Sequence, residues 1–238
     1  YYNMTVSING TTGITTPTYG GSVPSEYITP VTGFKNRIIN GDMKIDQRNA
    51  GASFTPTNSS YGLDRWRYQV SQTSKLTSQQ SSVAPAGFID SLLVTSSSSY
   101  SVLAADYFML RQRVEGYNVA DLNWGTASAQ AVTLSFWARS SLTGTFGGSV
   151  TNSAANRFYP FSYTISSADT WEYKTITIAG DTTGTWLTNN GIGIEINFSL
   201  GMGSTYSGTA GAWSSTAAYS ATGATSVVGT SGATFYIT

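Results

Sequence analysis

The clearest pattern in the sequence is the alternation of apolar and polar residues that is typical of a half-buried β-strand. It is most regular in residues 131–140 (AVTLSFWARS). The apolar set, which we expect to face a core, consists of Val132, Leu134, Phe136 and Ala138. The opposite set, which we expect to face outward, consists of Thr133, Ser135, Trp137 and Arg139.

A second stretch, residues 107–116 (YFMLRQRVEG), repeats this alternation with charged residues on its polar side. Its predicted core positions are Phe108, Leu110 and Val114, and its predicted outward positions are Arg111, Arg113 and Glu115. Further strands are predicted at residues 92–97, 157–166, 171–180, 191–200 and 233–238. Several strands separated by turn residues predict an all-β fold, either a sandwich or a barrel. The one predicted helical turn is short and lies near Gly116.

Two segments depart from the strand pattern. Residues 1–33 are rich in Thr and Gly and contain Pro17, Pro24 and Pro30, which limit both helix and ladder hydrogen bonding. We expect them to form an extended N-terminal arm or connector, with a loose tail as the alternative, ahead of a domain at 34–238. Residues 201–232 carry no charge and are too long for an ordinary loop. They are expected either to pack on themselves through their aromatic residues or to be buried against an identical copy.

Composition narrows the range of functions. Only 10% of the 238 residues are charged, against roughly 25% in an ordinary soluble domain. The absence of Cys and His excludes a disulfide framework, a Cys-ligated zinc, a Ser-His-Asp triad and a His metal ligand. The net charge of zero gives no reason to expect nucleic acid or an anionic membrane as a partner. No apolar run is long enough to predict membrane insertion.

Catalytic and metal chemistry have few candidates in this sequence. A glycosidase needs two facing carboxylates, and nothing in the spacing of the acidic residues shows which two would meet. We therefore predict no catalytic residues and no cofactor, and we keep open a structural Ca²⁺ held by carboxylates and backbone carbonyls. Asp64 is expected to form a structural ion pair with Arg65 or Arg67.

One group of residues indicates binding. If the alternation is right, Arg111, Arg113, Trp137 and Arg139 project from the outer side of two strands, which we expect to be neighbours. An indole ring beside guanidinium groups suits a sugar, because the ring stacks on the apolar sugar face while the donors bind hydroxyl or acid oxygens. Tyr159 and, more weakly, Tyr163 extend this predicted site. The alternative is that Trp137 covers the sheet beneath an arm or a subunit contact.

The sequence also resembles bacteriophage tail-fibre and related virion proteins. The resemblance rests on residues 36–51 (NRIINGDMKIDQRNAG) with LDRW at 63–66, on LRQRVEGYN and LNWG within 110–125, and on WEYKTITIAGDTTGTW at 171–186, and it covers about 34–238. It implies a jelly-roll sandwich similar to carbohydrate-binding modules, carried on a fibre that is usually trimeric. Such proteins typically continue past a strand like the terminal FYIT, so a closing strand is expected to be missing or supplied differently. The resemblance assigns no catalytic residues.

Three functions remain open at this stage. The first is a virion fibre or appendage protein that attaches the particle to its host by binding surface glycans. The second is a purely structural virion component, such as a head fibre, decoration or adaptor protein. The third is a glycan-degrading spike, although no solenoid repeat is present. In the first two, the chain is a homo-oligomer, a trimer by expectation, that contacts other virion proteins through its N-terminal arm at the particle surface.

Overall fold

The computed structural model describes residues 7–9, 13–15 and 35–238. The chain consists of two compact units, Tyr1–Asn36 and Arg37–Thr238. In the first unit, strands β1 (Ser7–Asn9) and β2 (Gly13–Thr15) form an antiparallel pair. The rest of the predicted arm, 1–33, lies outside the described residues. The second unit contains every other element of the fold.

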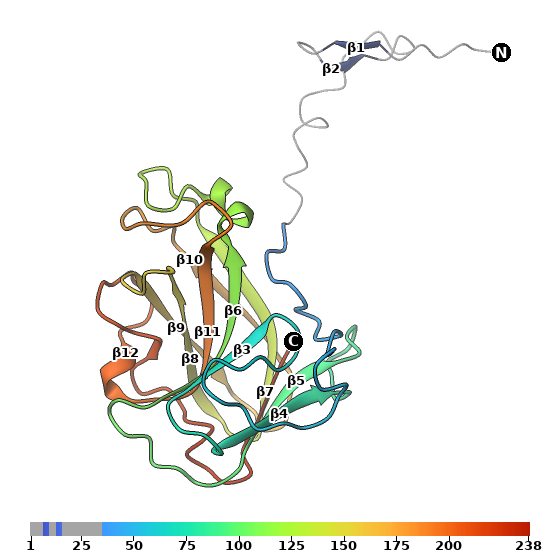
Figure 1. Ribbon diagram of the computed structural model, residues 1–238, viewed down its shortest axis with the longest axis vertical. Helices are drawn as coiled ribbons and strands as arrows, with labels where there is room; N and C mark the ends of the chain where they lie inside the picture. The colour runs from blue at the N-terminus through green and yellow to red at the C-terminus, as the bar shows by residue number, and fades with distance from the viewer. Residues whose placement is uncertain (1–6, 10–12, 16–34) are drawn as a thin grey trace, which may run out of the picture. The chain divides into compact units, whose positions relative to one another are not determined.

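The second unit is a sandwich of two five-stranded antiparallel sheets (Figure 1). Sheet I has the order β10-β7-β14-β5-β4 and is built from β4 (Leu76–Ser81), β5 (Ser91–Ser96), β7 (Val132–Ser140), β10 (Glu172–Ile178) and β14 (Thr234–Ile237). Sheet II has the order β3-β6-β11-β8-β9 and is built from β3 (Trp66–Val70), β6 (Tyr107–Glu115), β8 (Gly144–Thr151), β9 (Phe158–Ile165) and β11 (Ile192–Met202). The predicted all-β jelly-roll sandwich is confirmed. The predicted helical turn is also present, as the two short 3₁₀ turns η1 (Gly116–Asn118) and η2 (Ala120–Leu122).

The terminal FYIT run is a central strand. β14 lies between β5 and β7, and it pairs with both of them in antiparallel register. β14 therefore lies in the middle of sheet I.

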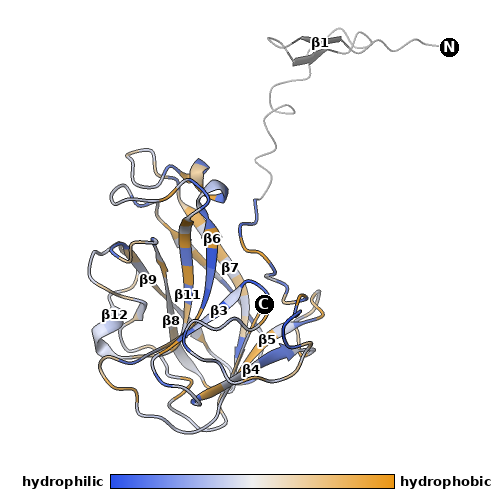
Figure 2. Ribbon diagram, in the orientation of Figure 1, coloured by the Kyte–Doolittle hydropathy of each residue, from blue (hydrophilic) through white to orange (hydrophobic). Residues whose placement is uncertain are grey.

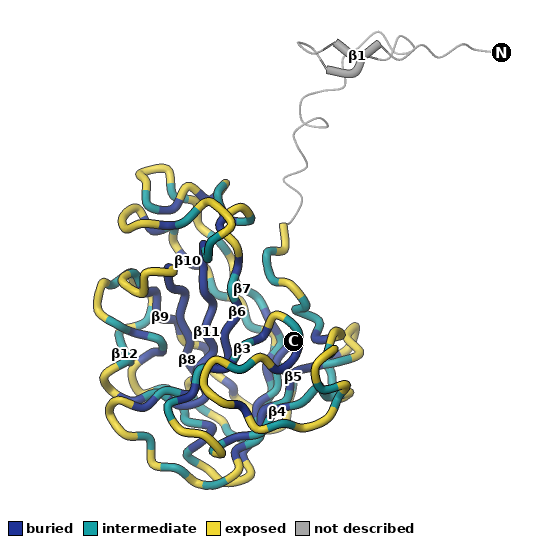
Figure 3. Tube along the Cα trace, in the orientation of Figure 1, coloured by how far each residue is buried: buried dark blue, intermediate teal, exposed yellow. Residues whose placement is uncertain are grey.

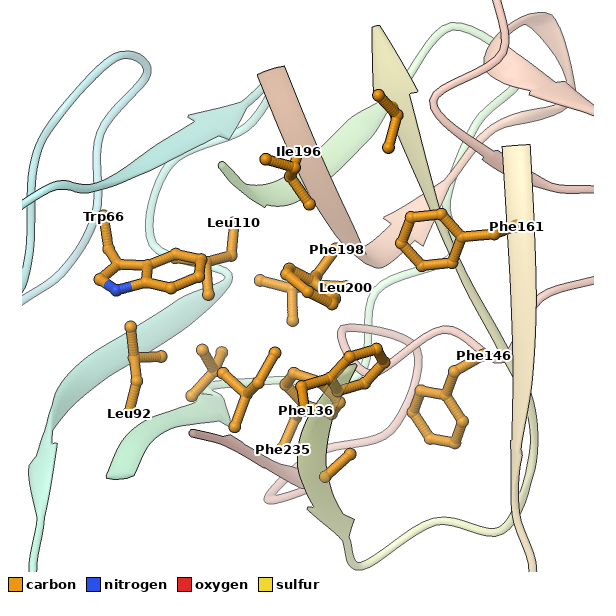
Figure 4. Packing of buried hydrophobic residues seen from close by; sticks show 14 of the residues in the cluster. Trp66, Leu92, Leu110, Phe136, Phe146, Phe161, Ile196, Phe198, Leu200 and Phe235 are labelled. Carbon is orange, nitrogen blue, oxygen red and sulfur yellow. The ribbon is translucent and has the colours of Figure 1, made fainter. Parts of the chain in front are cut away.

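Aromatic side chains from both sheets meet in the core (Figure 4). The ring of Phe136 in sheet I lies 5.0 Å from that of Phe198 in sheet II, and Phe146 lies 5.9 Å from Phe235, between ring centroids. Phe136 and Phe198 occupy the apolar side that the alternation predicts for their strands. Burying one such side chain stabilises the fold by about 1.5–3 kcal/mol. The core thus holds the two sheets together at fixed spacing.

Strands β3, β4 and β8 of the two sheets were not predicted as strands, and the reasons differ for β4 and β8. β4 is an edge strand with a single large apolar residue, Leu76, and Figure 2 shows most of it in hydrophilic colours. β8 contains Gly144, Gly147 and Gly148, and glycine weakens strand propensity. A Cβ at Gly148 would collide with the Phe161 ring, so glycine here allows close packing rather than marking a loop.

The uncharged segment 201–232 packs on its own chain, which bears out the first of its two predicted arrangements. It forms η3 (Ser204–Tyr206) and the parallel pair β12 (Ser207–Gly208) and β13 (Ser220–Ala221). The centroids of the Tyr219 and Phe158 rings are 5.2 Å apart. The guanidinium carbon of Arg111 lies 5.5 Å from the centroid of the Tyr219 ring and faces it. Consequently β6, β8, β9 and β11 are buried along much of their length (Figure 3).

Three tryptophans from distant parts of the sequence meet beside this segment. Trp124, Trp186 and Trp213 have centroid separations of 4.7, 5.3 and 5.3 Å. Trp213 Nε1 donates a hydrogen bond of 2.8 Å to the carbonyl of Ala179. This cluster attaches the segment 201–232 to the sandwich. Among the described residues, no helical element has the length and apolar character needed to cross a membrane.

Candidate functional site

The structure separates the predicted binding residues into two groups on different sheets. Arg111 and Arg113 lie on β6 of sheet II, whereas Trp137 and Arg139 lie on β7 of sheet I. The expectation that these two strands are neighbours is wrong. The alternation shows which side of a strand faces the core, but it carries no information on which sheet the strand joins. The chain changes sheets between β6 and β7.

Arg111 and Arg113 serve a buried ion-pair network. Arg111 Nη1 lies 2.9 Å from Glu195 Oε2, and Arg113 Nε lies 2.7 Å from Glu195 Oε1. Arg111 Nε also donates to Asn197 Oδ1 at 2.6 Å. Because Arg111 is only 6% exposed beneath the segment 201–232, it has no open face for a glycan. Arg111 therefore links the outer side of sheet II to the segment 201–232, which covers that side.

Tyr159 and Tyr163 lie on the core side of β9. Tyr159 pairs with Val150 in the inward phase of sheet II and packs 5.2 Å from Trp213. The Tyr163 ring lies 5.0 Å from that of Phe136 across the sandwich. Both predicted positions are corrected here: these rings are core residues, and the register of β9 leaves neither of them an exposed face.

Trp137 and Arg139 do lie on the outer side of sheet I, and the structure brings two further aromatic residues beside them. Tyr173 on β10 pairs directly with Trp137, and the centroids of the two rings are 5.3 Å apart. Tyr236 on β14 pairs directly with Arg139, whose guanidinium carbon lies 5.0 Å from the ring centroid. Residues that pair across neighbouring strands point to the same side of a sheet, so the four side chains form one surface.

Trp171 and Asp169 complete this surface. The Trp171 ring lies 6.0 Å from that of Tyr236 in an edge-to-face arrangement. Arg139 Nε donates to the carbonyl of Asp169 at 2.8 Å, and its Nη2 lies 3.3 Å from Asp169 Oδ1. We call the group the aromatic face: Trp137, Arg139, Trp171, Tyr173 and Tyr236.

The aromatic face is open enough to meet a ligand. Tyr173 is 56% exposed, and Trp137, Trp171 and Tyr236 are half-buried. Contact with Tyr236 and Asp169 holds Arg139 over the sheet, so little side-chain freedom remains to be lost on binding. Flat rings beside a fixed guanidinium match the two surfaces of a sugar, its apolar ring face and its hydroxyl oxygens.

Part of the aromatic face was accessible from the sequence but was not predicted. Trp171 and Tyr173 occupy alternate positions of WEYKTITI, and Tyr236 alternates with Phe235 and Ile237. Applying the same alternation to these two strands would have placed all three side chains outward. That β10 and β14 flank β7 could not be read from the pattern.

The resolved pKa shifts among the carboxylates do not favour a general acid. Burial opposes the ionisation of Asp106, but hydrogen bonds from Tyr100, the Leu103 amide, Ser71 and Gln72 outweigh it and lower the pKa of Asp106 below its ordinary value. Burial likewise opposes the ionisation of Glu172, while Lys174 and the amides of Ser167 and Ser166 lower its pKa. A catalytic general acid requires the opposite shift.

Other acidic residues are also occupied within the fold. Asp181 is buried and bidentate to Arg157, with distances of 2.6 and 2.7 Å. Within 7–9, 13–15 and 35–238, no three acidic side chains lie together as a metal-ion cluster would require. The predicted Asp64 pair is absent: Asp64 Oδ2 instead accepts the Gln47 amide at 2.7 Å, and the described residues show no ion pair from Asp64 to Arg65 or Arg67.

Comparison with known proteins gives similarity at the level of structure alone. No known protein family and no curated protein matches the sequence. The enzymatically active domain of bacteriophage CBA120 tailspike protein 4 is similar over 84% of this chain, with 14% identity and a TM-score of 0.43. The chain spans 20% of the length of that domain.

Two carbohydrate-binding modules show a comparable degree of similarity. TmCBM61, solved with β-1,4-galactotriose, has 13% identity and a TM-score of 0.40, and 85% of this chain and 94% of that chain are covered. A CBM4 module has 15% identity and a TM-score of 0.39, with 84% and 94% covered. At these values the function has to be inferred from the side chains of this chain.

Proposed function

We propose that the chain is a bacteriophage virion fibre or appendage protein whose sandwich binds glycans of the host surface through the aromatic face. The observation that carries the glycan-binding part is the exposed arrangement of Trp137 and Tyr173 beside Arg139 on one side of sheet I. The virion part is supported by the resemblance of residues 36–51 and 63–66 to tail-fibre proteins. The particle surface is the corresponding location.

We further propose that the chain acts as a trimer and contacts other virion proteins through residues 1–33. The Thr-, Gly- and Pro-rich composition of this arm supports the oligomer. The segment 201–232 no longer does, because its Tyr206, Trp213 and Tyr219 have partners within the chain.

The experiment that tests glycan binding is a glycan array and a host-cell binding assay with the purified chain and Trp137→Ala. We expect the substitution to weaken binding by about tenfold or more, the effect of losing one central aromatic contact. The melting temperature should change little, because Trp137 lies outside the core. Thr177→Ala is the matched control, since Thr177 is exposed on the same side of β10 as Tyr173 but outside the aromatic face.

The outcomes separate the candidate functions. Equal binding by Trp137→Ala and the parent chain would exclude the aromatic face as the binding surface. No binding to any glycan or host cell would favour a structural virion component. Release of reducing sugar from a bound glycan would favour the glycan-degrading spike.

A further inference from the structure

A polar cleft of about 480 Å³ lies away from the aromatic face, at one end of sheet II. Its volume falls in the range of small-molecule sites, about 300–1,000 Å³. We call it the arginine cleft, after the side chains that dominate its lining: Arg48, Tyr61, Asp64, Arg65, Arg113 and Glu115. They come from the chain before and at the start of β3 and from the end of β6. None of them belongs to the aromatic face.

Three guanidinium groups and two carboxylates line the cleft, which is an excess of one positive charge. Two of its three guanidinium groups, those of Arg48 and Arg65, form no ion pair with any residue that the structure describes. The third, Arg113, shares Glu195 with Arg111. Unpaired guanidinium groups around a cavity favour an anionic ligand, and their fork geometry fits a carboxylate.

The sheet behind the cleft adds to this charge. Arg67 on β3 pairs directly with Arg111 on β6 and lies on the same outer side as Arg113. Its Nη1 is buried and has no hydrogen-bond partner among the described residues. Burial, followed by the charge of Arg113, lowers the pKa of Arg67. Arg67 does not itself line the cleft, but it adds a further positive charge beside Arg113.

Arg65 is held in an unfavourable backbone conformation at the mouth of the cleft. Its φ of 74° lies in the left-handed region, which arginine rarely adopts. The one hydrogen bond that its guanidinium donates within the described chain, to the Arg113 carbonyl, is long at 3.3 Å. The guanidinium of Arg65 is therefore exposed and only weakly held by the fold, so it is available to a ligand.

The remaining lining residues favour a sugar over a free anion. Tyr61 is 40% exposed, and the Arg48 guanidinium carbon lies 5.5 Å from its ring centroid. The ring can stack on a pyranose, while the carboxylates of Asp64 and Glu115 accept hydrogen bonds from hydroxyl groups. A simple inorganic anion would use the arginines alone. It would meet the two carboxylates as repulsive neighbours.

From this arrangement we propose that the arginine cleft binds the carboxylate-bearing sugar of an acidic glycan. This site is separate from the aromatic face and does not depend on the function proposed for that face. The chain then has two glycan-contacting surfaces, one for neutral sugar rings on sheet I and one for a sugar acid at the end of sheet II.

Calorimetric titration of the full chain tests this proposal with four probes: an oligogalacturonate, its methyl ester, a neutral galactose oligosaccharide and inorganic phosphate. We expect the free acid to bind and the methyl ester to bind at least about tenfold more weakly, which is the effect of losing one hydrogen bond between charged groups. Binding of the acid should weaken as salt is added. No binding of the acid, or equal binding of acid and ester, would overturn the proposal. Equal or tighter binding of phosphate would also overturn it, in favour of a simple anion site.

Two variants locate the binding. Arg65→Asn removes the guanidinium, and asparagine tolerates the left-handed backbone, so the melting temperature should be unchanged or higher while binding of the acid falls about tenfold. Arg48→Gln, at an exposed position, should weaken binding without affecting folding. Thr177→Ala, on β10 and outside both surfaces, should leave binding of the acid unchanged. If both arginine variants bind the acid like the parent chain, the site lies elsewhere.

Discussion

At the scale of single residues, the chain has few charged side chains, but three of them form an ion-pair network inside the fold. Glu195 is the only charged residue after position 181, and it is buried between Arg111 and Arg113. A buried carboxylate is tolerated only when cations and hydrogen bonds compensate its charge. Here Arg111 and Arg113 compensate Glu195, and Glu195 in turn is the counterion of both arginines. The network therefore depends on one side chain more than on any other.

We predict that Glu195→Gln destabilises the chain by about 3 kcal/mol, because it leaves two partly or fully buried arginines without their counterion. Urea unfolding of the variant and the parent chain measures the change. Asp42→Asn is the matched control, since the Asp42–Lys44 pair is exposed and contributes less than about 1 kcal/mol. Equal stability of Glu195→Gln and the parent would contradict the importance of the network.

At the scale of elements, the segment 201–232 serves as a third layer over sheet II. Trp213 is its main attachment, through its ring contacts with Trp124, Trp186 and Tyr159 and its hydrogen bond to Ala179. Tyr206 and Tyr219 hold its middle part to β6 and β9, and Val227 and Val228 bury its last part in the core. Its attachment should therefore be lost locally before the sandwich unfolds.

We predict that Trp213→Ala destabilises the chain by about 3 kcal/mol, the lower end of the range for a tryptophan truncation because the ring is half-buried. Hydrogen exchange should accelerate at the amides of 207–222 more than in β6, β8 or β11. Tyr117→Ala, at a position 66% exposed, should change neither quantity. Uniform acceleration across the sandwich would show instead that the segment is part of the cooperative core.

The elements also show how far the sequence carries a prediction. Alternation located β5, β6, β7, β9, β10, β11 and β14 and gave the inward side of β7 correctly, because burial of one strand face is a local property. Pairing between strands is not local. The alternation placed Trp137 and Arg139 outward correctly. It could not show that Arg111 and Trp137 lie on different sheets, or that Tyr236 on β14 lies beside Arg139. Tyr159 was misplaced because Phe158 and Pro160 make the first half of β9 apolar on both sides, although Ser162 and Thr164 alternate clearly with buried residues in its second half.

At the scale of the whole molecule, the surface is poor in charge. The net charge is zero, and Asp106, Arg111, Asp181 and Glu195 are all buried. A protein with little net charge lacks the repulsion that keeps copies apart. Apolar side chains at Val83, Phe88 and Ile89 are exposed between β4 and β5. Little electrostatic repulsion therefore opposes association between copies, and this loop is the apolar surface to compare with the N-terminal arm.

We predict that native mass spectrometry of the full chain gives three times the chain mass of 25.2 kDa. Residues 37–238 alone should be a folded monomer, because their core and the segment 201–232 are packed within one chain. The proposal places the trimer contact in residues 1–33. Ile89→Ser, in the loop between β4 and β5, should leave the trimer intact. That result would show that the contact between copies does not depend on this apolar loop. A monomeric full chain would contradict the trimer. A trimer formed by residues 37–238 would place the contact on the sandwich, and the loop between β4 and β5 would then be the first surface to test.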